Sequence, residues 1–204
     1  AGKINKVSLT NFDTEHMLAM VTGGIPITSH QLQYSLLDSR PAQRMVAAAA
    51  EHNVALLTYG TVAGGFLGDA WLGQPEPGGG LENRSLIKYK LIIDDFGGWE
   101  LFQRLLRALR DIADKHGVDI ATVASAAVLR RPGVAAVIVG ARTLNHLAAN
   151  LAIGSLTLDA DDLRQIGTVL ADARPLDGDV YSLERDRTSK HGAVMKYNLN
   201  KGAA

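Results

Sequence analysis

Polar and aromatic side chains stand at the ends of three apolar segments of this sequence. Thr10 and Asn11 follow the first segment, Gln31 ends the second, and Tyr59 ends the third, "VALLTY". If these segments are parallel strands of a barrel, their carboxyl ends meet on the face where ligands bind. A hydroxyl, two amides and a phenol ring on that face would suit a planar heterocycle that carries an amide. Each residue alone fits a turn or a core equally well, but the four together favour a binding site.

The glycines after the third segment give a weaker signal. Gly60, Gly64, Gly65 and Gly68 follow "LLTY", but no G-x-G-x-x-G opens a helix and no Gly-Lys-Ser/Thr is present. A Rossmann or P-loop phosphate site is therefore not indicated, and a flexible turn is the simpler interpretation.

The remaining polar residues form no catalytic or metal-binding pattern. The six histidines are scattered without H-x-H or H-E-x-x-H spacing, G-x-S-x-G is absent, and there is no cysteine. The run "DADD" at 159–162 is typical of a helix N-terminus, and "ERDR" at 184–187 is typical of a solvated charge run. From these patterns we predict no metal ligand and no catalytic residue.

The composition is that of a globular protein without net charge. Of 204 residues, 47% are hydrophobic and 21% are charged, and 21 basic residues balance 21 acidic ones. This balance indicates neither nucleic acid nor an anionic membrane as a partner. No apolar run is long enough to span a bilayer, no signal segment precedes the first strand, and the lack of cysteine fits the cytoplasm. We therefore expect a cytoplasmic protein.

Apolar periodicity predicts strands that alternate with helices. Strands are expected at residues 4–9, 26–31, 54–59 and 135–139. Helices are expected after Asp13 and at residues 41–52, 99–116, 120–130, 143–151 and 159–171. Residues 60–98 form a long irregular excursion, and 174–204 a polar tail without clear periodicity. The order predicts an α/β fold with a parallel sheet, either an open doubly wound sheet or part of a (β/α)8 barrel.

Four motifs of the sequence resemble consecutive segments of the aldo-keto reductase family. They are "VSLTNF", "QLQYSLLD", "LLTYGTVAGGFL" and "VAAVIVGARTLNHLAANL", which resemble the family's strands five to eight with their loops. The resemblance extends over nearly all of residues 1–200. It implies a parallel barrel of TIM type of which this chain holds about half, as a single domain over 1–204 with a C-terminal tail at 174–204.

The resemblance also implies a cofactor, NADP or NAD, and residues that would bind it. Carboxamide contacts would come from the first two motifs, ring stacking and pyrophosphate contacts from the third, and adenosine-phosphate contacts from the fourth. In that order the residues are Thr10, Asn11 and Gln31; Tyr59; Gly60, Val62 and Gly65; Gly140, Arg142, His146 and Asn150. Thr10 replaces the usual Ser, and Gly60-Thr61 replaces Ser-Pro. Gly140 stands where many NADP-specific members carry Lys, which leaves NADP against NAD open.

The family's catalytic Asp, Tyr, Lys and His belong to its first four strands, and this sequence begins with the fifth-strand motif. We therefore expect the cofactor-binding half of an NAD(P)-dependent carbonyl reductase that is inactive alone. Lys88, Tyr89 and Lys90 could replace the missing catalytic side chains, but their position in the irregular region favours ordinary loop residues. The alternatives are a non-catalytic nicotinamide-binding or regulatory module and, more weakly, a lyase or epimerase of sugar phosphates.

Half a barrel would expose two sheet edges and an apolar face, which promote association. The expected partners are accordingly the missing N-terminal half or a second copy of the chain, together with a small carbonyl substrate. The loop after Gly60 could close over the cofactor, and the tail after Arg174 could shape the substrate pocket.

Overall fold

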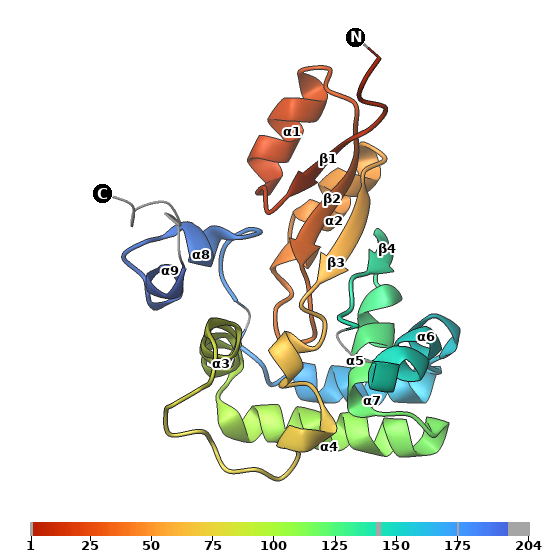
Figure 1. Ribbon diagram of the computed structural model, residues 1–204, viewed down its shortest axis with the longest axis vertical. Coiled ribbons are helices and arrows are strands. Elements are labelled where there is room, and N and C mark those ends of the chain that lie inside the picture. Colours follow the sequence, from red (N-terminus) through yellow and green to blue (C-terminus); the bar gives the residue numbers. More distant parts are fainter. Residues whose placement is uncertain (1, 142–143, 175, 196–204) are drawn as a thin grey trace.

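The computed structural model describes residues 2–141, 144–174 and 176–195, and its centre is one parallel sheet (Figure 1). The strands are β1 (Val7–Thr10), β2 (Ile27–Gln33), β3 (Ala55–Tyr59) and β4 (Val134–Val137). They pair in chain order, so β1 and β4 are the two edges. The predicted α/β fold with a parallel sheet is confirmed, and within the described residues the sheet is open.

Helices connect and cover the strands. They are α1 (Thr14–Thr22), α2 (Met45–Glu51), α3 (Arg84–Phe96), α4 (Trp99–His116), α5 (Ile120–Leu129), α6 (Leu147–Ser155), α7 (Ala160–Leu170), α8 (Ser182–Arg185) and α9 (Lys190–Val194). Short 3₁₀ turns are η1 (Arg40–Ala42), η2 (Ala63–Gly65), η3 (Asp69–Trp71) and η4 (Leu144–His146). The carboxylates of Asp13, Asp119 and Asp159 cap α1, α5 and α7, as their positions before apolar periodic segments predicted.

Two predicted irregular regions contain helices. Residues 60–98 hold η2, η3 and the 13-residue helix α3. Asn83 caps α3 by accepting from the N–H of Leu86 at 3.0 Å, and Tyr89, Ile92, Ile93 and Phe96 are buried at helical spacing. The described part of the C-terminal tail contains α8 and α9. Both regions follow Gly- or Pro-rich stretches, which concealed the weaker helical signals.

The two faces of the sheet differ in burial. On one face Leu9, Leu32 and Leu56 are buried against Met17 of α1 and Met45 of α2 in one apolar cluster. The opposite face presents the alternate residues, which are mostly small or polar and, apart from buried Gln33, are exposed or half-buried. These are Ser8, Thr10, Ser29, Gln31, Gln33, Ala55, Leu57, Tyr59 and Ala136.

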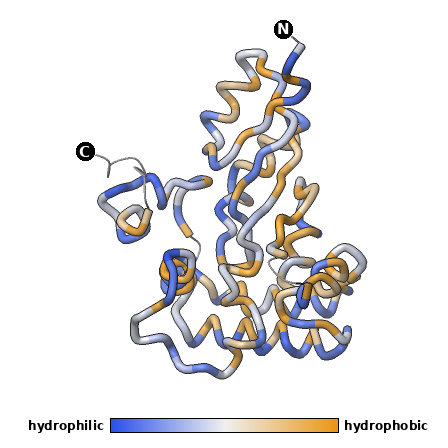
Figure 2. The backbone as a smooth tube through the Cα atoms, viewed as in Figure 1, coloured by the Kyte–Doolittle hydropathy of each residue, from blue (hydrophilic) through white to orange (hydrophobic). Residues whose placement is uncertain are grey.

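A second apolar cluster holds α3 to α7 together below the sheet. In α4 the buried residues Leu101, Leu105 and Leu109 recur every four positions, and the alternation with hydrophilic residues is visible along this helix in Figure 2. Gly117, with φ +66°, ends α4 in a left-handed cap. The helix thereby forms a base for the loop that follows β3.

Candidate functional site

The predicted residues of the first three strands meet at the carboxyl ends of these strands, which form the carboxyl edge of the sheet. The Tyr59 hydroxyl donates a hydrogen bond to Asn11 Oδ1 at 2.8 Å, and the Asn11 N–H donates to the Gln31 carbonyl at 3.0 Å. Thr10 is the direct neighbour of Gln31 across the β1–β2 pair. One boundary was wrong, because β2 continues past Gln31 to Gln33, which pairs with Tyr59.

Asn11 and Tyr59 have defined conformational and protonation states. Asn11 has φ +58°, a left-handed conformation that Asn tolerates better than most residues. Burial, reinforced by the nearby Tyr89 and Glu184, raises the pKa of Tyr59 well above its usual range. Tyr59 is therefore a neutral phenol near pH 7, so it can donate its proton in the hydrogen bond to Asn11.

A cavity of about 610 Å³ adjoins this edge and collects six further predicted residues. It lies between the loop after β3, the N-terminal part of α5, the end of β4 and α6. Its lining includes Gly60, Val62, Gly65, Gly140, His146 and Asn150. Asn150 Nδ2 donates to the Gly140 carbonyl at 2.9 Å, which ties α6 to the segment after β4. Arg142 lies outside the described residues.

The loop after β3 contains backbone N–H groups that have no backbone acceptor among the described residues. Gly60, Gly64 and Gly65 have φ of +74°, +66° and +105°, and in the described chain the N–H groups of Thr61, Val62 and Gly64 have no backbone acceptor. The N–H of Ala63 between them donates to the Gly60 carbonyl at 2.9 Å, so Thr61 and Val62 supply two successive free N–H groups. Successive free N–H groups in such turns form a site for an anion. The loop can therefore bind phosphate oxygens without a G-x-G-x-x-G motif.

The part of this loop after Gly68 is anchored to α4 and α5, and the predicted flexible turn at Gly60 to Gly68 stays a prediction. Asp69 accepts from the Ile120 N–H at 3.2 Å and pairs with Arg110. Gln103 Nε2 donates to the Trp71 carbonyl and its Oε1 accepts from the Gly73 N–H, both at 2.8 Å. The anchoring residues lie on α4 and at the start of α5, 30 or more positions away, so local sequence could not reveal them.

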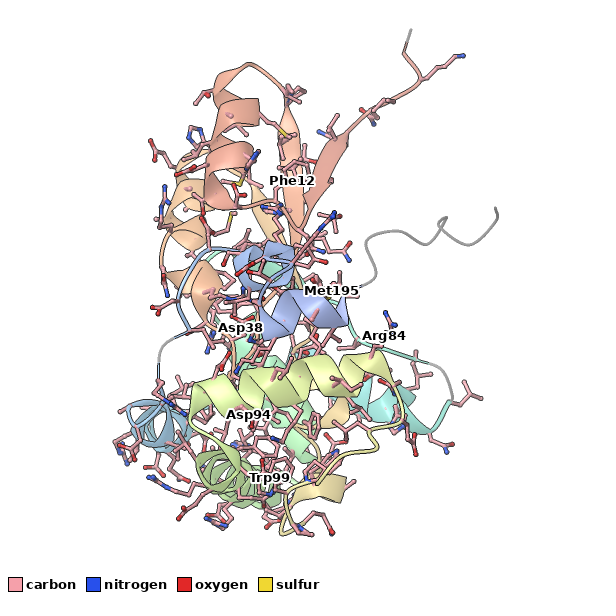
Figure 3. The ribbon with its side chains drawn as sticks, turned by 90° about the vertical axis from the view of Figure 1, so that its left-hand side faces the viewer. Phe12, Asp38, Arg84, Asp94, Trp99 and Met195 are labelled. Carbon is pink, nitrogen blue, oxygen red and sulfur yellow. The ribbon has the colours of Figure 1, made fainter. Side chains whose placement is uncertain are left out.

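Helix α3 contributes residues that the sequence did not identify. Ser85 and Tyr89 line the 610 Å³ cavity and also a second cavity of about 410 Å³ that reaches Tyr59. Arg84, Lys88, Val194 and Met195 complete the second cavity. Figure 3 shows Arg84 at the start of α3 close to Met195 at the end of α9. The Asn83 cap and the apolar spacing of α3 were the signals that could have identified this helix.

Within the run "ERDR", Glu184 departs from the predicted solvated charge run, whereas Arg185, Asp186 and Arg187 are exposed. Glu184 is fully buried and accepts from Arg40 Nη1 at 3.1 Å, and its other oxygen lies 3.2 Å from Lys88 Nζ. Arg40 also binds Asp38 at 2.9 and 2.7 Å. Burial alone would raise the pKa of Glu184, but Arg40 and Lys88 hold this pKa below its usual value. A buried carboxylate requires such partners.

No group of three or more His, Asp or Glu side chains is placed to hold a metal ion in residues 2–141, 144–174 and 176–195. No helix in the same ranges is long and apolar enough to cross a membrane.

Comparison with known proteins identifies the family. Residues 1–171 match the model of the aldo/keto reductase family, so the chain belongs to this family. The matched region holds all four strands and α1 to α7, whereas the resemblance inferred from sequence extended to about residue 200. The segment with α8 and α9 lies beyond the match.

Individual relatives are similar at moderate identity. "Flagellar radial spoke protein 5" of Chlamydomonas reinhardtii is 34% identical over 125 residues, 60% of this chain and 24% of the relative. "Protein tas" of Escherichia coli (strain K12) is 30% identical over 174 residues, 83% of this chain and 49% of the relative. "Uncharacterized oxidoreductase YrpG" of Bacillus subtilis (strain 168) is 24% identical over 175 residues, 83% and 50%. The chain thus spans about half or less of the length of these relatives.

Proposed function

We propose that this chain is the cofactor-binding half of an NAD(P)-dependent aldo-keto reductase that reduces an aldehyde or ketone. The observation that carries the proposal is the contact between Asn11 and Tyr59 beside the glycine-lined cavity. It unites an amide, a phenol ring and free backbone N–H groups along one edge of a parallel sheet. The proposed cofactor is NADP or NAD, and the proposed location of the protein is the cytoplasm.

The residues present fit a dinucleotide. The N–H groups of Thr61, Val62 and Gly64 would receive the pyrophosphate, and the Tyr59 ring would stack on the nicotinamide. Thr10, Asn11 and Gln31 would hold the carboxamide, and Gly140, His146 and Asn150 the adenosine end, with Arg142 assigned there by resemblance alone. The bound cofactor would supply a hydride to the carbonyl carbon. The chain itself would bind and orient the cofactor.

The catalytic proton donor is proposed to come from outside this chain. Tyr89 and Lys88 are the nearest substitutes, but burial raises the pKa of Tyr89 well above its usual range. Lys88 is 3.2 Å from Glu184, with which it forms an ion pair. A phenol that holds its proton this strongly does not suit proton transfer near neutral pH, and the Lys88 ammonium is engaged by Glu184. The same observation favours the second candidate function, a module that binds nicotinamide nucleotides without turnover.

The partner proposed for this half is the N-terminal half of the barrel or a second copy of the chain. Both edge strands lack a neighbour in the described structure. Large apolar side chains are exposed before β1 (Ile4), before β2 (Ile25), after β4 (Ile138) and on α6 (Leu147 and Leu151). A further set of strands and helices would cover them, in agreement with relatives that are about twice as long.

Dinucleotide titration tests the proposal. NADH or NADPH should bind the purified chain, with energy transfer from tryptophan as the readout. Tyr59→Ala should weaken binding about tenfold or more, because stacking of a planar ring on an aromatic side chain contributes about 1–3 kcal/mol. Tyr59→Phe keeps the ring and should retain most of the affinity. No binding by the wild-type chain, or unchanged affinity of Tyr59→Ala, would contradict the proposal.

A further inference from the structure

The segment from Leu176 to Met195, here called the C-terminal segment, is joined to the loops that follow β1 and β2. The Asp179 carboxylate accepts from the Thr14 N–H at 3.1 Å and from Thr14 Oγ1 at 2.9 Å. Gln43 Nε2 donates to the Leu176 carbonyl at 2.9 Å. Figure 1 shows α8 and α9 of this segment between α1 and α3. The segment therefore borders the edge that carries Asn11 and Tyr59.

Arg185 makes the contact of this segment with Asn11. Its Nη2 donates to the Asn11 carbonyl at 2.6 Å, and its Nη1 donates to Asp13 Oδ2. The guanidinium also lies 5.9 Å from the centre of the Tyr181 ring. Because a guanidinium is planar and presents its donors in a fixed fork, it fixes both acceptors relative to each other. Arg185 thus spans the turn from residue 11 to residue 13.

Three of the four polar groups of Asn11 are engaged. Its N–H donates to Gln31, its carbonyl accepts from Arg185, and Oδ1 accepts from Tyr59. Within the described residues Nδ2 has no acceptor, so it is the one donor of Asn11 available to a ligand. Asn11 also holds φ +58°, which an L-residue keeps only when surrounding contacts fix it.

We propose that Arg185 is a positioning residue for the nicotinamide end of the dinucleotide. It holds the left-handed turn at Asn11, so that Oδ1 meets Tyr59 and Nδ2 serves an acceptor oxygen of the ligand, the carboxamide oxygen. The inference rests on the proposed function. It assigns a role in ligand binding to the C-terminal segment, which lies beyond the family match.

The location of Arg185 predicts that its substitution affects some ligands and not others. The adenosine end of the site is formed by the end of β4 and by α6, and no residue of α8 lines that cavity. A variant at 185 should therefore affect ligands that carry nicotinamide and spare ligands that lack it. A general loss of structure would affect both kinds of ligand.

The experiment compares NADH and NADPH with ADP as a probe without nicotinamide. Arg185→Ala should lower NAD(P)H affinity about tenfold and leave ADP affinity within about twofold. Arg185→Lys keeps the charge without the fork and should give an intermediate loss. Arg164→Ala on α7 removes a surface pair with Asp161 and is the matched control, with unchanged binding of every probe. The nitrogen-15 shifts of the Asn11 backbone and side chain should change in Arg185→Ala and not in the control.

Each result is decisive. Unchanged NAD(P)H affinity in Arg185→Ala, an equal loss for ADP, or unchanged Asn11 shifts would overturn the positioning role while the wild-type protein still binds dinucleotide. If the wild-type chain binds neither NAD(P)H nor ADP, the proposed function fails and the inference fails with it. If wild-type binds ADP but no nicotinamide nucleotide, the nicotinamide site and Arg185's role in it are refuted.

Discussion

Gly60 lies where the chain leaves β3, and Tyr89 occupies the space that a side chain would need there. A Cβ atom at residue 60 would lie 2.3 Å from the Tyr89 hydroxyl oxygen, and φ is +74°. Gly60→Ala should therefore lose about 1–3 kcal/mol of unfolding free energy and bind dinucleotide more weakly. Urea denaturation and titration measure the two effects.

A second substitution separates steric overlap from backbone strain. With Tyr89→Phe, the nearest atom to the new Cβ is the ring carbon at 3.2 Å, so part of the stability should return. Gly65→Ala is the control for strain alone, since φ is +105° and no atom lies within 4 Å of its Cβ. Wild-type stability of Gly60→Ala would show that Tyr89 moves freely and would contradict the close approach.

His30 makes stability depend on pH. It is fully buried, its Nε2 accepts from the Phe12 N–H at 3.1 Å, and burial lowers its pKa to about 4, despite the opposing effect of Asp179 and Asp13. The unfolded chain takes up a proton below about pH 6.5, whereas the folded chain does so only near pH 4. Stability should therefore fall by about 3 kcal/mol as the pH drops through this window.

A non-titrating side chain tests this assignment. Urea unfolding at pH 7, 5.5 and 4.5 should give a slope for the wild-type chain that is much reduced in His30→Gln, whose amide oxygen can accept from Phe12. Carboxylates with lowered pKa, such as Glu184, add their loss of stability at lower pH. An equal slope in both proteins between pH 6.5 and 4.5 would assign the effect elsewhere.

At the scale of elements, α3 connects the parts of the site. Its Tyr89 fills the space at Gly60, its Lys88 pairs with Glu184, and its Asp95 lies 2.6 Å from His191 of α9. The helix thus joins the loop after β3 to the C-terminal segment. Movement of the C-terminal segment should therefore change the shape of the second cavity, which α3 and this segment both line.

Loss of the Glu184 charge should release the C-terminal segment. Glu184→Gln would leave buried Arg40 with Asp38 as its acidic partner and half-buried Lys88 without its ion pair to Glu184. Removal of one member of a buried pair costs about 3–5 kcal/mol. Amide exchange should accelerate through residues 176–195 and the melting temperature should fall. Glu82→Gln, at an exposed position before α3, should change neither measurement. Unchanged exchange in Glu184→Gln would mean that apolar contacts suffice to hold the segment.

The elements that sequence predicted well are those whose signals are local. Helix α4 with its apolar stripe and helix α5 with its Asp119 cap begin where expected, and the apolar strands placed Asn11 and Tyr59 at the carboxyl ends of the sheet. Glu184 and Arg185 could not be interpreted in this way, because Arg40 is 144 positions from Glu184 and Asn11 is 174 from Arg185. Whether a charged run is exposed or buried depends on the distant residues that it contacts. The local sequence pattern does not reveal which residues these are.

At the scale of the whole molecule, polarity is unevenly distributed over the uncovered face of the sheet. Near β1 and β2 this face is polar, and Ser8 and Ser29 share a hydrogen bond at 2.7 Å. Near β4 it is apolar, with Leu57 half-buried and Ile138 exposed. The predicted apolar face is thus confined to one side. The polar side can contact water or ligand, whereas the apolar side and the open β4 edge favour a protein partner.

This asymmetry predicts which surface drives association. Leu151 is 71% exposed on α6, which the Asn150–Gly140 hydrogen bond ties to the segment after β4, and β4 is an edge strand of the sheet. We expect the purified chain to self-associate at micromolar concentration, because burial of apolar surface contributes about 25 cal/mol per Å². Sedimentation velocity over a concentration series should show a dimer or larger species. Leu151→Glu should weaken this association several-fold without destabilising α6, since the side chain makes little contact within the chain.

The matched control is Leu163→Glu on α7, a helix that packs against α4, where the leucine is 47% exposed. Added negative charge is the same in the two variants, so a difference between them reflects location. Equal weakening would point to non-specific charge repulsion, and a sharp monomeric transition of the wild-type chain would show that the open edges are tolerated. A selective effect of Leu151→Glu would instead place the contact beside β4, where a closing barrel strand would add, and would leave the polar side of the sheet free for the cofactor.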